Sequence, residues 1–332
     1  MEPSGIDLGA ALASLLTPTA IVALVNATIR NAVPITLGAM SGIVSERSGI
    51  VNIGIEGMML GGAFVGYMAN VFFSTLLPNP EQQALRLILA VFAAVLTGGI
   101  MALLHAVLSI RYKVDQVISG TVINIFALGI TGYLYVQGTS TRGGFPPAFA
   151  NPFSIENGAL FYIGEVVFKK DLLTYFAVLV VPLVGYTLYR TTWGLRSRAI
   201  GEKPSAADTL GVNVYRLQYT NLFLSGALAA LGGATLTLAG ITFERGMVSG
   251  RGFIALACMI FGGWRPARAF AGALLFGFLT ALQGQLQFAG LEQIIPHQLI
   301  ATLPYLMTLV VLAGFGLKTR PPANVGKAYE VG

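Results

Sequence analysis

Polar side chains interrupt long apolar stretches of this sequence, and the densest group lies near residue 50. Asn52 and Glu56 are four positions apart, so they share one face of a helix. A carboxylate within an apolar helix is costly to bury and normally faces water or protein. Glu56 therefore has two interpretations that both stay open here: it lines a polar pathway, or it pairs with a base or caps a helix N-terminus.

Amide and hydroxyl groups recur in the later apolar stretches. An amide side chain donates and accepts hydrogen bonds without selecting for charge, so it suits a neutral polar solute as well as a neighbouring helix. A structural role therefore competes with solute binding at each of these positions. The candidates for lining a solute pathway are Asn52, Glu56, Asn124, Ser225, Gln283 and Gln287.

The end of one uncharged stretch carries a different set of groups. Phe243, Glu244 and Arg245 follow one another there. We expect them near an outer mouth of the pathway, where they either gate the opening or anchor the end of a helix.

Several kinds of chemistry have no residues to support them. The sequence contains no Gly-x-x-x-x-Gly-Lys-Ser/Thr phosphate-binding loop, so we do not expect the chain to hydrolyse ATP. The single cysteine, Cys258, excludes an internal disulfide and a cysteine-based zinc cluster. Two histidines offer little for a metal or haem site. We therefore predict a protein that is not an enzyme and that holds no cofactor or metal of its own.

The composition indicates that lipid surrounds the elements carrying these residues. Of 332 residues, 55% are apolar and only 10% are charged, whereas soluble domains carry roughly 25% charged residues. The net charge of +6 does not indicate nucleic-acid binding, because the bases are scattered at the ends of apolar stretches and form no stripe. The 41 glycines favour close helix packing.

Apolar stretches long enough to cross a membrane recur along the whole chain. A crossing helix needs roughly 20 apolar residues, and we predict an all-α polytopic bundle of about ten crossings (eight to ten) that forms a single transmembrane domain over residues 1–332. Residues 32–44 end at a polar break, and residues 252–263 are too short for an ordinary crossing, so we expect broken or re-entrant helices inside the bundle. The stretches are residues 8–29, 32–44, 57–80, 87–110, 116–141, 172–189, 217–243, 252–263, 269–291 and 297–317.

Lysine and arginine are more frequent in alternate connections, and this bias predicts the orientation. It places both termini and a loop of residues 190–216 in the cytoplasm, and a loop of residues 138–171 outside. Within the inner loop, Pro204 suits the first turn of a short helix and Gly211 suits its stop. Farther on, Gly226 with Ala230 and Ala229 with Gly233 are small residues four apart, which favours close contact between helices.

The run SERSGIVNIGIEGMML at residues 45–60 closely resembles the hallmark of one branch of ATP-binding-cassette (ABC) importer permeases. That branch carries simple sugars and nucleosides and includes the ribose-type and branched-chain amino-acid permeases. Residues 202–211 resemble its cytoplasmic coupling segment, and SGALA at 225–229 and IFGG at 260–263 match further landmarks in the expected order. The resemblance covers residues 30–317, which is most of the chain.

The resemblance implies a bacterial inner-membrane permease with partners that composition does not show. These are a second, often related permease chain, a cytoplasmic ATPase that binds ATP and magnesium, and an external solute-binding lipoprotein. The form of the hallmark is more similar to nucleoside-type than to ribose-type members, so a nucleoside is favoured and simple sugars stay open. The residues implied in coupling to the ATPase are Glu202, Pro204, Ala206, Ala207, Asp208 and Gly211.

Two rival functions stay open at this point. A stand-alone secondary transporter would show broken helices at equivalent places in two halves, and glycine-rich interruptions do occur near residues 50–62 and 250–263. A structural membrane subunit needs no pathway at all. Transport without an ATPase would favour the first rival, and co-purification with an ATPase would argue against the second.

Overall fold

The computed structural model describes residues 13–135, 144–147, 151–152, 159–239, 241–290 and 319–330, with residues 296, 298–299, 302 and 306. The described elements are helices, as predicted, and the one β feature among them is an isolated antiparallel bridge between Pro147 and Asp171. The elements are α2 (Pro18–Glu46), α3 (Ile55–Leu76), η1 (Pro80–Gln82), α4 (Gln83–Ala106), the π-helical turn η2 (Val107–Arg111), α5 (Gln116–Leu134), α6 (Ala159–Val167), α7 (Leu172–Arg190), α8 (Thr192–Glu202), α9 (Pro204–Thr209), α10 (Val214–Leu238), α11 (Arg251–Phe261) and α12 (Pro266–Phe288).

Helix α2 corrects the predicted pair of crossings at residues 8–29 and 32–44. It runs unbroken from Pro18 to Glu46 and carries Arg30 within it rather than in a connection. Arg30 is exposed, so its charge does not oblige the helix to end, and a proline such as Pro34 is tolerated inside a membrane helix when neighbours satisfy the freed carbonyl. Pro18 consequently lies at the opposite end of the molecule from Glu46, whereas the prediction placed the chain start on the side of residues 190–216.

The number of crossings also differs from the prediction. In the part of the chain that the structure describes, seven helices are long and apolar enough to span a membrane, and α11 is a shorter apolar helix. The predicted crossing at residues 297–317 falls almost wholly outside the described residues, as do residues 8–12 and 136–141 at the ends of two other predicted crossings. The total of about ten crossings is therefore not confirmed, because two of those predicted are one helix.

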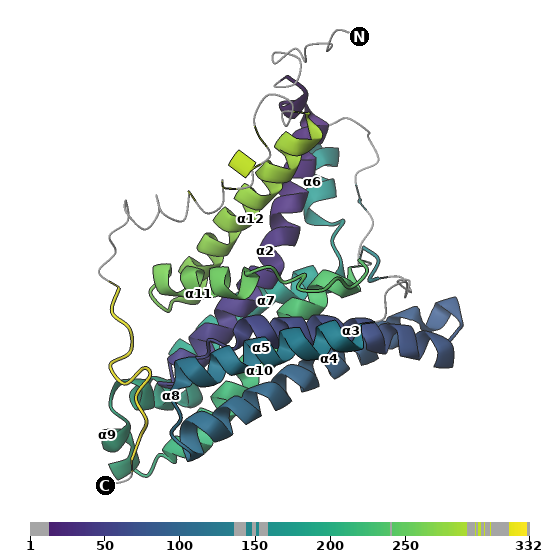
Figure 1. Ribbon diagram of the computed structural model, residues 1–332. Helices are drawn as coiled ribbons and strands as arrows, with labels where there is room; N and C mark the ends of the chain where they lie inside the picture. The colour runs from purple at the N-terminus through teal and green to yellow at the C-terminus, as the bar shows by residue number, and fades with distance from the viewer. Residues whose placement is uncertain are drawn as a thin grey trace.

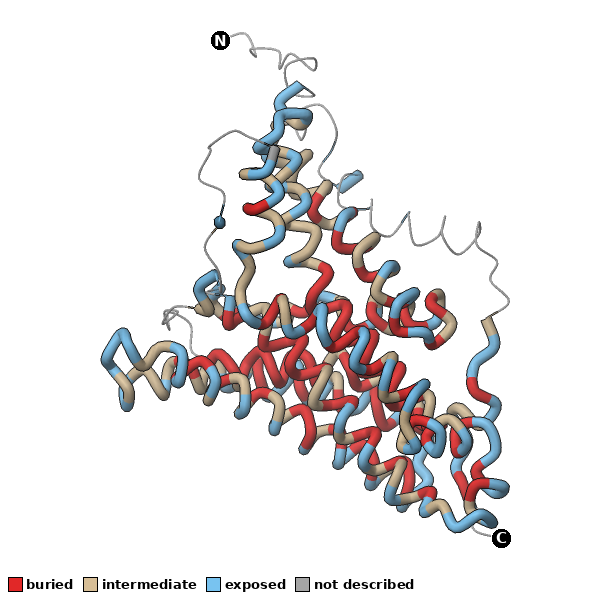
Figure 2. Tube along the Cα trace, turned by 180° about the vertical axis from the view of Figure 1, so that it is seen from behind, coloured by how far each residue is buried: buried red, intermediate tan, exposed pale blue. Residues whose placement is uncertain are grey.

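Helix α10 occupies the centre of the bundle, packed against α2, α3 and α4 (Figure 1). Glycines permit this contact: a Cβ on Gly98 of α4 would lie 2.2 Å from the carbonyl oxygen of Gly226, and one on Gly233 would lie 1.7 Å from that of Met59. The predicted packing role of the small residues in α10 is thus confirmed. Figure 2 shows the buried residues gathered where these helices cross, with exposed residues along the outer faces.

One end of the molecule collects the ends of several helices. Helices α8 and α9 lie there, with the last residues of α2 and α7 and the first residues of α10, and we call it the α9 end (Figure 1). Helix α9 begins at Pro204 as predicted, and Gly211 has the left-handed φ of +79° that suits a helix stop. The described part of the predicted outer loop, residues 138–171, contains α6 and Asp171, which caps α7 through the Thr174 N–H.

Two interrupted regions lie within the bundle. The first break, residues 47–54, joins α2 to α3, and the second break, residues 241–250, leads into α11. Helix α11 has 11 residues, which makes it about 16 Å long and too short to cross a bilayer. Residues 252–263, predicted to be a short broken or re-entrant piece, therefore form a half-length helix.

Candidate functional site at the two breaks and the α9 end

The first break is held by side chains that reach it from other helices. The Val51 N–H donates to Gln116 Oε1 at 2.7 Å, and His105 Nε2 donates to the Val51 carbonyl at 2.9 Å. His105 Nδ1 in turn lies 2.9 Å from the Ser119 hydroxyl. Backbone polar groups inside a bilayer need such partners, because no water is present to replace them. His105 and Gln116 therefore hold the backbone of the first break in place by hydrogen bonds.

Asn124 binds the same segment nearer the start of α3. Its Oδ1 accepts from the Gly57 N–H at 2.7 Å, and its Nδ2 donates to the Ile53 carbonyl at 3.0 Å. Asn124 is eight residues beyond Gln116 on α5. The contacts of these two side chains with the first break and the start of α3 therefore begin about 12 Å apart along that helix. Asn124 thus binds neighbouring backbone in this structure, and its place in a solute pathway stays a prediction.

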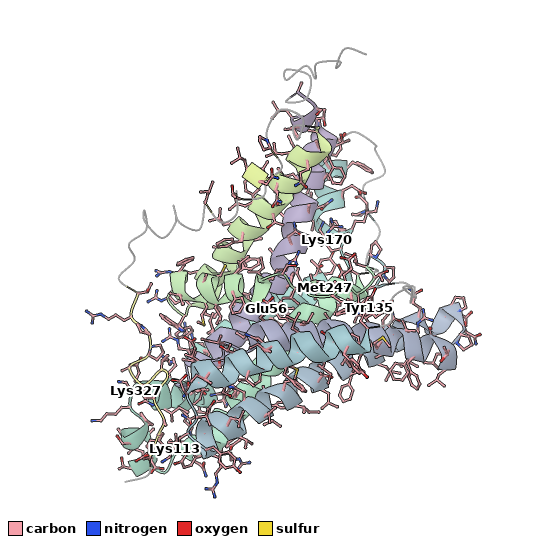
Figure 3. All side chains as sticks on the ribbon, viewed as in Figure 1. Glu56, Lys113, Tyr135, Lys170, Met247 and Lys327 are labelled. Carbon is pink, nitrogen blue, oxygen red and sulfur yellow. The ribbon has the colours of Figure 1, made fainter. Side chains whose placement is uncertain are left out.

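Glu56, in the first turn of α3 just beyond the first break, ties that region to the second break. Its carboxylate accepts from the Gly250 N–H at 2.8 Å and from the Gly252 N–H at 2.7 Å. These donors belong to the N-terminus of α11, where the first N–H groups have no partner in the helix and a negative charge is favourable. Figure 3 shows Glu56 in the middle of the molecule, beside the segment that carries Met247. Glu56 therefore caps α11 in this structure, and its place in a solute pathway stays a prediction.

Asn52 and Ser225 meet in a closed polar group. Asn52 Nδ2 donates to the Ser225 Oγ at 2.9 Å, and that oxygen lies 2.9 Å from the Ser41 Oγ of α2. All three residues are fully buried, and Asn52 Oδ1 has no hydrogen-bond partner. The group joins α2, the first break and α10, so a pathway along these two candidates requires the three elements to separate.

The remaining pathway candidates lie elsewhere. Gln283 and Gln287 are half-buried on α12, where Gln285 donates to the Ala20 carbonyl of α2 at 2.8 Å. The six candidates therefore do not form one site: Glu56 and Asn124 bind backbone at the breaks, and the two glutamines lie on another helix.

The three outer-mouth candidates differ in how far they are buried. Phe243 is fully buried, with its ring 5.2 Å from that of Phe64 and 5.4 Å from that of Tyr135. Such packing fits the anchoring alternative, while a position at an outer mouth stays a prediction for all three residues. Glu244 and Arg245 are exposed beside it.

The far end of α11 reaches the α9 end. Trp264 Nε1 donates to Glu46 Oε2 at 2.6 Å, and Arg47 Nη2 donates to the Trp264 carbonyl at 3.1 Å. Residues 250–264, which include α11, are thus attached at both ends to residues 46–56, through Glu56 at one end and through Glu46 and Arg47 at the other. A movement of that segment must displace α11 as well.

The coupling candidates surround α9, but they face different ways. Pro204 and Ala207 are buried against the bundle, while Ala206 and Gly211 are exposed. Asp208 accepts a hydrogen bond from the Tyr329 hydroxyl at 2.9 Å, and the exposed Glu202 accepts from the Ala323 N–H at 3.3 Å.

Two apolar residues at this end were not among the predicted candidates. Leu210 is 84% exposed and Leu195 is 60% exposed, although both belong to a polar connection. Both side chains are accessible to a partner protein that docks on α8 and α9. The sequence feature that could have indicated these two residues is their position, since Leu210 lies within the coupling segment of residues 202–211 and Leu195 lies earlier in the same predicted inner loop.

Comparison with known proteins places residues 24–312 in the family model described as the branched-chain amino acid transport system permease component. The guanosine ABC transporter permease protein NupQ of Bacillus subtilis is 36% identical over 307 residues, covering 91% of this chain and 94% of that one. The nucleoside ABC transporter permease protein NupC of Lactococcus lactis is 35% identical, covering 89% and 93%. TsgC13 of Haloferax volcanii, whose name assigns it provisionally to glucose ABC transport, is 34% identical, covering 89% and 92%.

Proposed function

The chain belongs to the family of branched-chain amino acid transport permease components, and on this premise we propose that it forms half of the pore of an ABC importer that carries nucleosides across the bacterial inner membrane. A permease component is a pore subunit and not an enzyme. One observation carries the proposal: relatives named for guanosine and nucleoside transport match this chain over about nine-tenths of both sequences.

The substrate class is tested by competition. The complex, reconstituted in vesicles with its ATPase and its solute-binding protein, should import labelled guanosine only when ATP is present. Excess unlabelled nucleoside should suppress that uptake, whereas glucose and ribose should leave it unchanged. The identity with TsgC13 is the observation that favours a sugar instead. Uptake of labelled glucose without uptake of guanosine would therefore replace the nucleoside assignment.

We place the α9 end in the cytoplasm, together with the C-terminal residues 319–330. Arg190, Arg196 and Arg198 accompany α8 and α9 at this end, as the positive-inside rule requires of a cytoplasmic connection. The partners are a second permease chain, a cytoplasmic ATPase that binds ATP and magnesium, and an external solute-binding lipoprotein. Labelling of a cysteine in residues 190–216 from outside the cell would contradict this orientation.

The geometry supports coupling by a movement that passes from α9 to the breaks. ATP binding in the partner would shift α8 and α9, and the contacts of Arg47 and Glu46 with Trp264 would carry that shift to α11. The closed group of Asn52, Ser225 and Ser41 would then open and close as two states exchange.

Exposed residues of the coupling element make the docking test specific. Leu210→Asp or Ala206→Glu should abolish ATP-dependent uptake while the chain still reaches the membrane, because both side chains point away from the bundle. Asn79→Asp is the control, since Asn79 is exposed at the other end of the bundle, in the turn between α3 and α4. Ala207 is a poorer probe, because it is buried and a charge there disturbs the fold itself. Normal uptake by both α9-end variants would contradict the docking assignment.

The stand-alone alternative needs no partner. Purified chain reconstituted without an ATPase should show no uptake of guanosine down a concentration gradient. Uptake under those conditions would favour a secondary transporter, for which the two breaks meeting at Glu56 are the structural argument.

A further inference from the structure

Residues 319–330, which we call the C-terminal strap, lie across the α9 end. The strap has no regular secondary structure, yet its backbone and side chains contact three separate parts of the molecule. Figure 3 shows Lys327 of the strap and Lys113 of the α4–α5 turn at the same corner of the molecule. Neither the composition nor any sequence motif singled out this segment.

The first contact is with the coupling element. The Asn324 N–H donates to the Gly201 carbonyl in the last turn of α8 at 2.9 Å. Tyr329 donates its hydroxyl to Asp208 of α9, and its ring packs with Ala207 and Val214. Burial and the Asp208 carboxylate raise the pKa of Tyr329, so at neutral pH the phenol stays protonated and remains the donor.

The second contact is with the first break. The Gly326 N–H donates to the Gly49 carbonyl at 3.1 Å. Gly49 has a φ of +90°, and a Cβ on it would lie 3.5 Å from the Asn324 carbonyl, so the strap passes directly over the break. Val51, two residues farther on, is the residue held by Gln116 and His105.

The third contact is with the turn between α4 and α5. Lys113 forms a salt bridge with Glu330 at 2.5 Å, and the hydrogen bond from Lys113 lowers the pKa of Glu330. Both side chains are well exposed, so this pair positions the end of the strap and adds little stability.

These contacts matter because α9 is too short to hold its own position. A helix of six residues is unstable alone and depends on its tertiary contacts. The buried face of α9, formed by Pro204 and Ala207, lies against α8, α10 and the strap, and Ala207 packs with Ile200, Val214 and the ring of Tyr329. The strap therefore supplies part of the seat of α9 and binds the first break in the same twelve-residue segment.

We propose that the C-terminal strap is a second coupling element, in which Tyr329 positions α9 and the Gly326–Gly49 hydrogen bond passes the movement of α9 to the first break. The proposal rests on the importer function proposed above. In it, the strap and α9 move as one unit when the ATPase acts, so the strap determines how much of each ATP-driven movement reaches the membrane helices.

The test measures coupling rather than stability. In vesicles that contain the whole complex, Tyr329→Phe should lower the amount of solute imported per ATP hydrolysed by about twofold or more, the scale of the smallest net contribution of a single hydrogen bond. The ring and its packing are preserved, so the chain should fold and ATP hydrolysis should continue. Tyr112→Phe is the matched control, because Tyr112 lies beside Lys113 and its side chain is exposed. An unchanged import-to-hydrolysis ratio for Tyr329→Phe would overturn the proposal.

A cross-linking measurement tests the contact without using transport. In a Cys258→Ser background, the side chains introduced by Asp208→Cys and Tyr329→Cys should be joined within one chain by a short bismaleimide, and mass spectrometry of the peptides identifies the link. Absence of this link would overturn the proposed contact between Tyr329 and α9. If the link forms and the unsubstituted complex imports no solute with ATP, the importer function fails while the contact stands. If the unsubstituted complex imports solute and only Tyr329→Phe loses coupling, the proposal holds.

Discussion

Both breaks contain backbone N–H and carbonyl groups that lie outside a helix, and the two breaks differ in where these groups find hydrogen-bond partners. From Val51 onward the first break depends on other helices, since Gln116, His105 and Asn124 supply partners for its backbone groups, whereas residues 48–50 bond back to the last turn of α2. The second break satisfies much of its own backbone through short-range turns, such as Met247 N–H to the Glu244 carbonyl and Ser249 N–H to the Gly246 carbonyl. The backbone position of the first break therefore depends on the arrangement of α4 and α5, whereas the second break is a local turn that Glu56 links to the first.

This difference has a consequence for movement. A segment whose partners sit on several helices must exchange those partners when the helices shift, so it favours a small number of discrete arrangements. A segment that satisfies itself can move as a unit with the short helix that follows it. We therefore expect the first break to set the state of the bundle and α11 to follow through Glu56.

Removal of the tie between the breaks should have the largest effect. Glu56→Ala strands the N–H groups of Gly250 and Gly252 at membrane depth, and it should destabilise the fold by roughly 2–4 kcal/mol and abolish uptake. The melting temperature of the purified chain in detergent reports the first effect. Glu81→Ala, at an exposed position in η1, is the control and should change neither quantity. A melting temperature unchanged in Glu56→Ala would show that the breaks are independent.

Crowding the same junction should have the next largest effect. A Cβ on Gly252 would lie 2.7 Å from the Glu56 Cα, so Gly252→Ala should push α11 away and cost about 1–3 kcal/mol. Gly284→Ala in α12 meets open space, and the added methyl should leave stability equal or raise it by up to about 1 kcal/mol. The two melting temperatures compare the same chemical change at a tight and an open helical glycine. Equal values would contradict the close contact at Gly252.

The side-chain support of the first break is the third target. Asn124→Ala removes the acceptor for the Gly57 N–H and the donor to the Ile53 carbonyl, at a cost of about 1–2 kcal/mol. Thr121→Ala on the same helix is the control, since its hydroxyl bonds only to the Val117 carbonyl of its own helix. Hydrogen exchange of the Gly57 amide should rise in Asn124→Ala alone. Equal exchange in the two variants would argue that the break holds itself, as the second break does.

The smallest effect is expected at the buried hydroxyl between α2, α10 and the first break. Ser225→Ala loses the contacts with Asn52 and Ser41 and should lower stability by about 1 kcal/mol or less. Because the group closes the space between these elements, uptake should change more than the melting temperature does. A variant with wild-type uptake would remove Ser225 and Asn52 from the pathway proposal.

Much of the fold was predictable because lipid leaves little choice of structure. Long uncharged stretches must form helices there, and small residues four apart in α10 indicated the close contact that Gly98 and Gly226 make. The division of residues 8–44 into two crossings was wrong, because Arg30 next to Asn31 resembles a connection although nothing in either residue ends a helix. A charged residue inside one long helix and a charged residue in the connection between two helices look the same in the local sequence.

The candidate site was predicted as residue types and not as partnerships. Asn52, Glu56 and Asn124 were recognised as polar groups that an apolar environment must compensate. Which group compensates which depends on residues far apart in the chain: Glu56 binds the N–H groups of Gly250 and Gly252, and Asp208 binds Tyr329.

By itself, the amino-acid sequence determined that this chain is a bundle of apolar helices with two glycine-rich interruptions and a short helix in a basic connection, since these follow from hydropathy and local backbone preferences. Only the tertiary structure decided that the two interruptions meet at Glu56, that Phe243 packs inside an aromatic cluster, and that residues 319–330 bind α9 and the first break together. Hydrogen-bond pairing across the bundle depends on which helix faces come together. That choice is made by packing over the whole chain, and no local pattern records it.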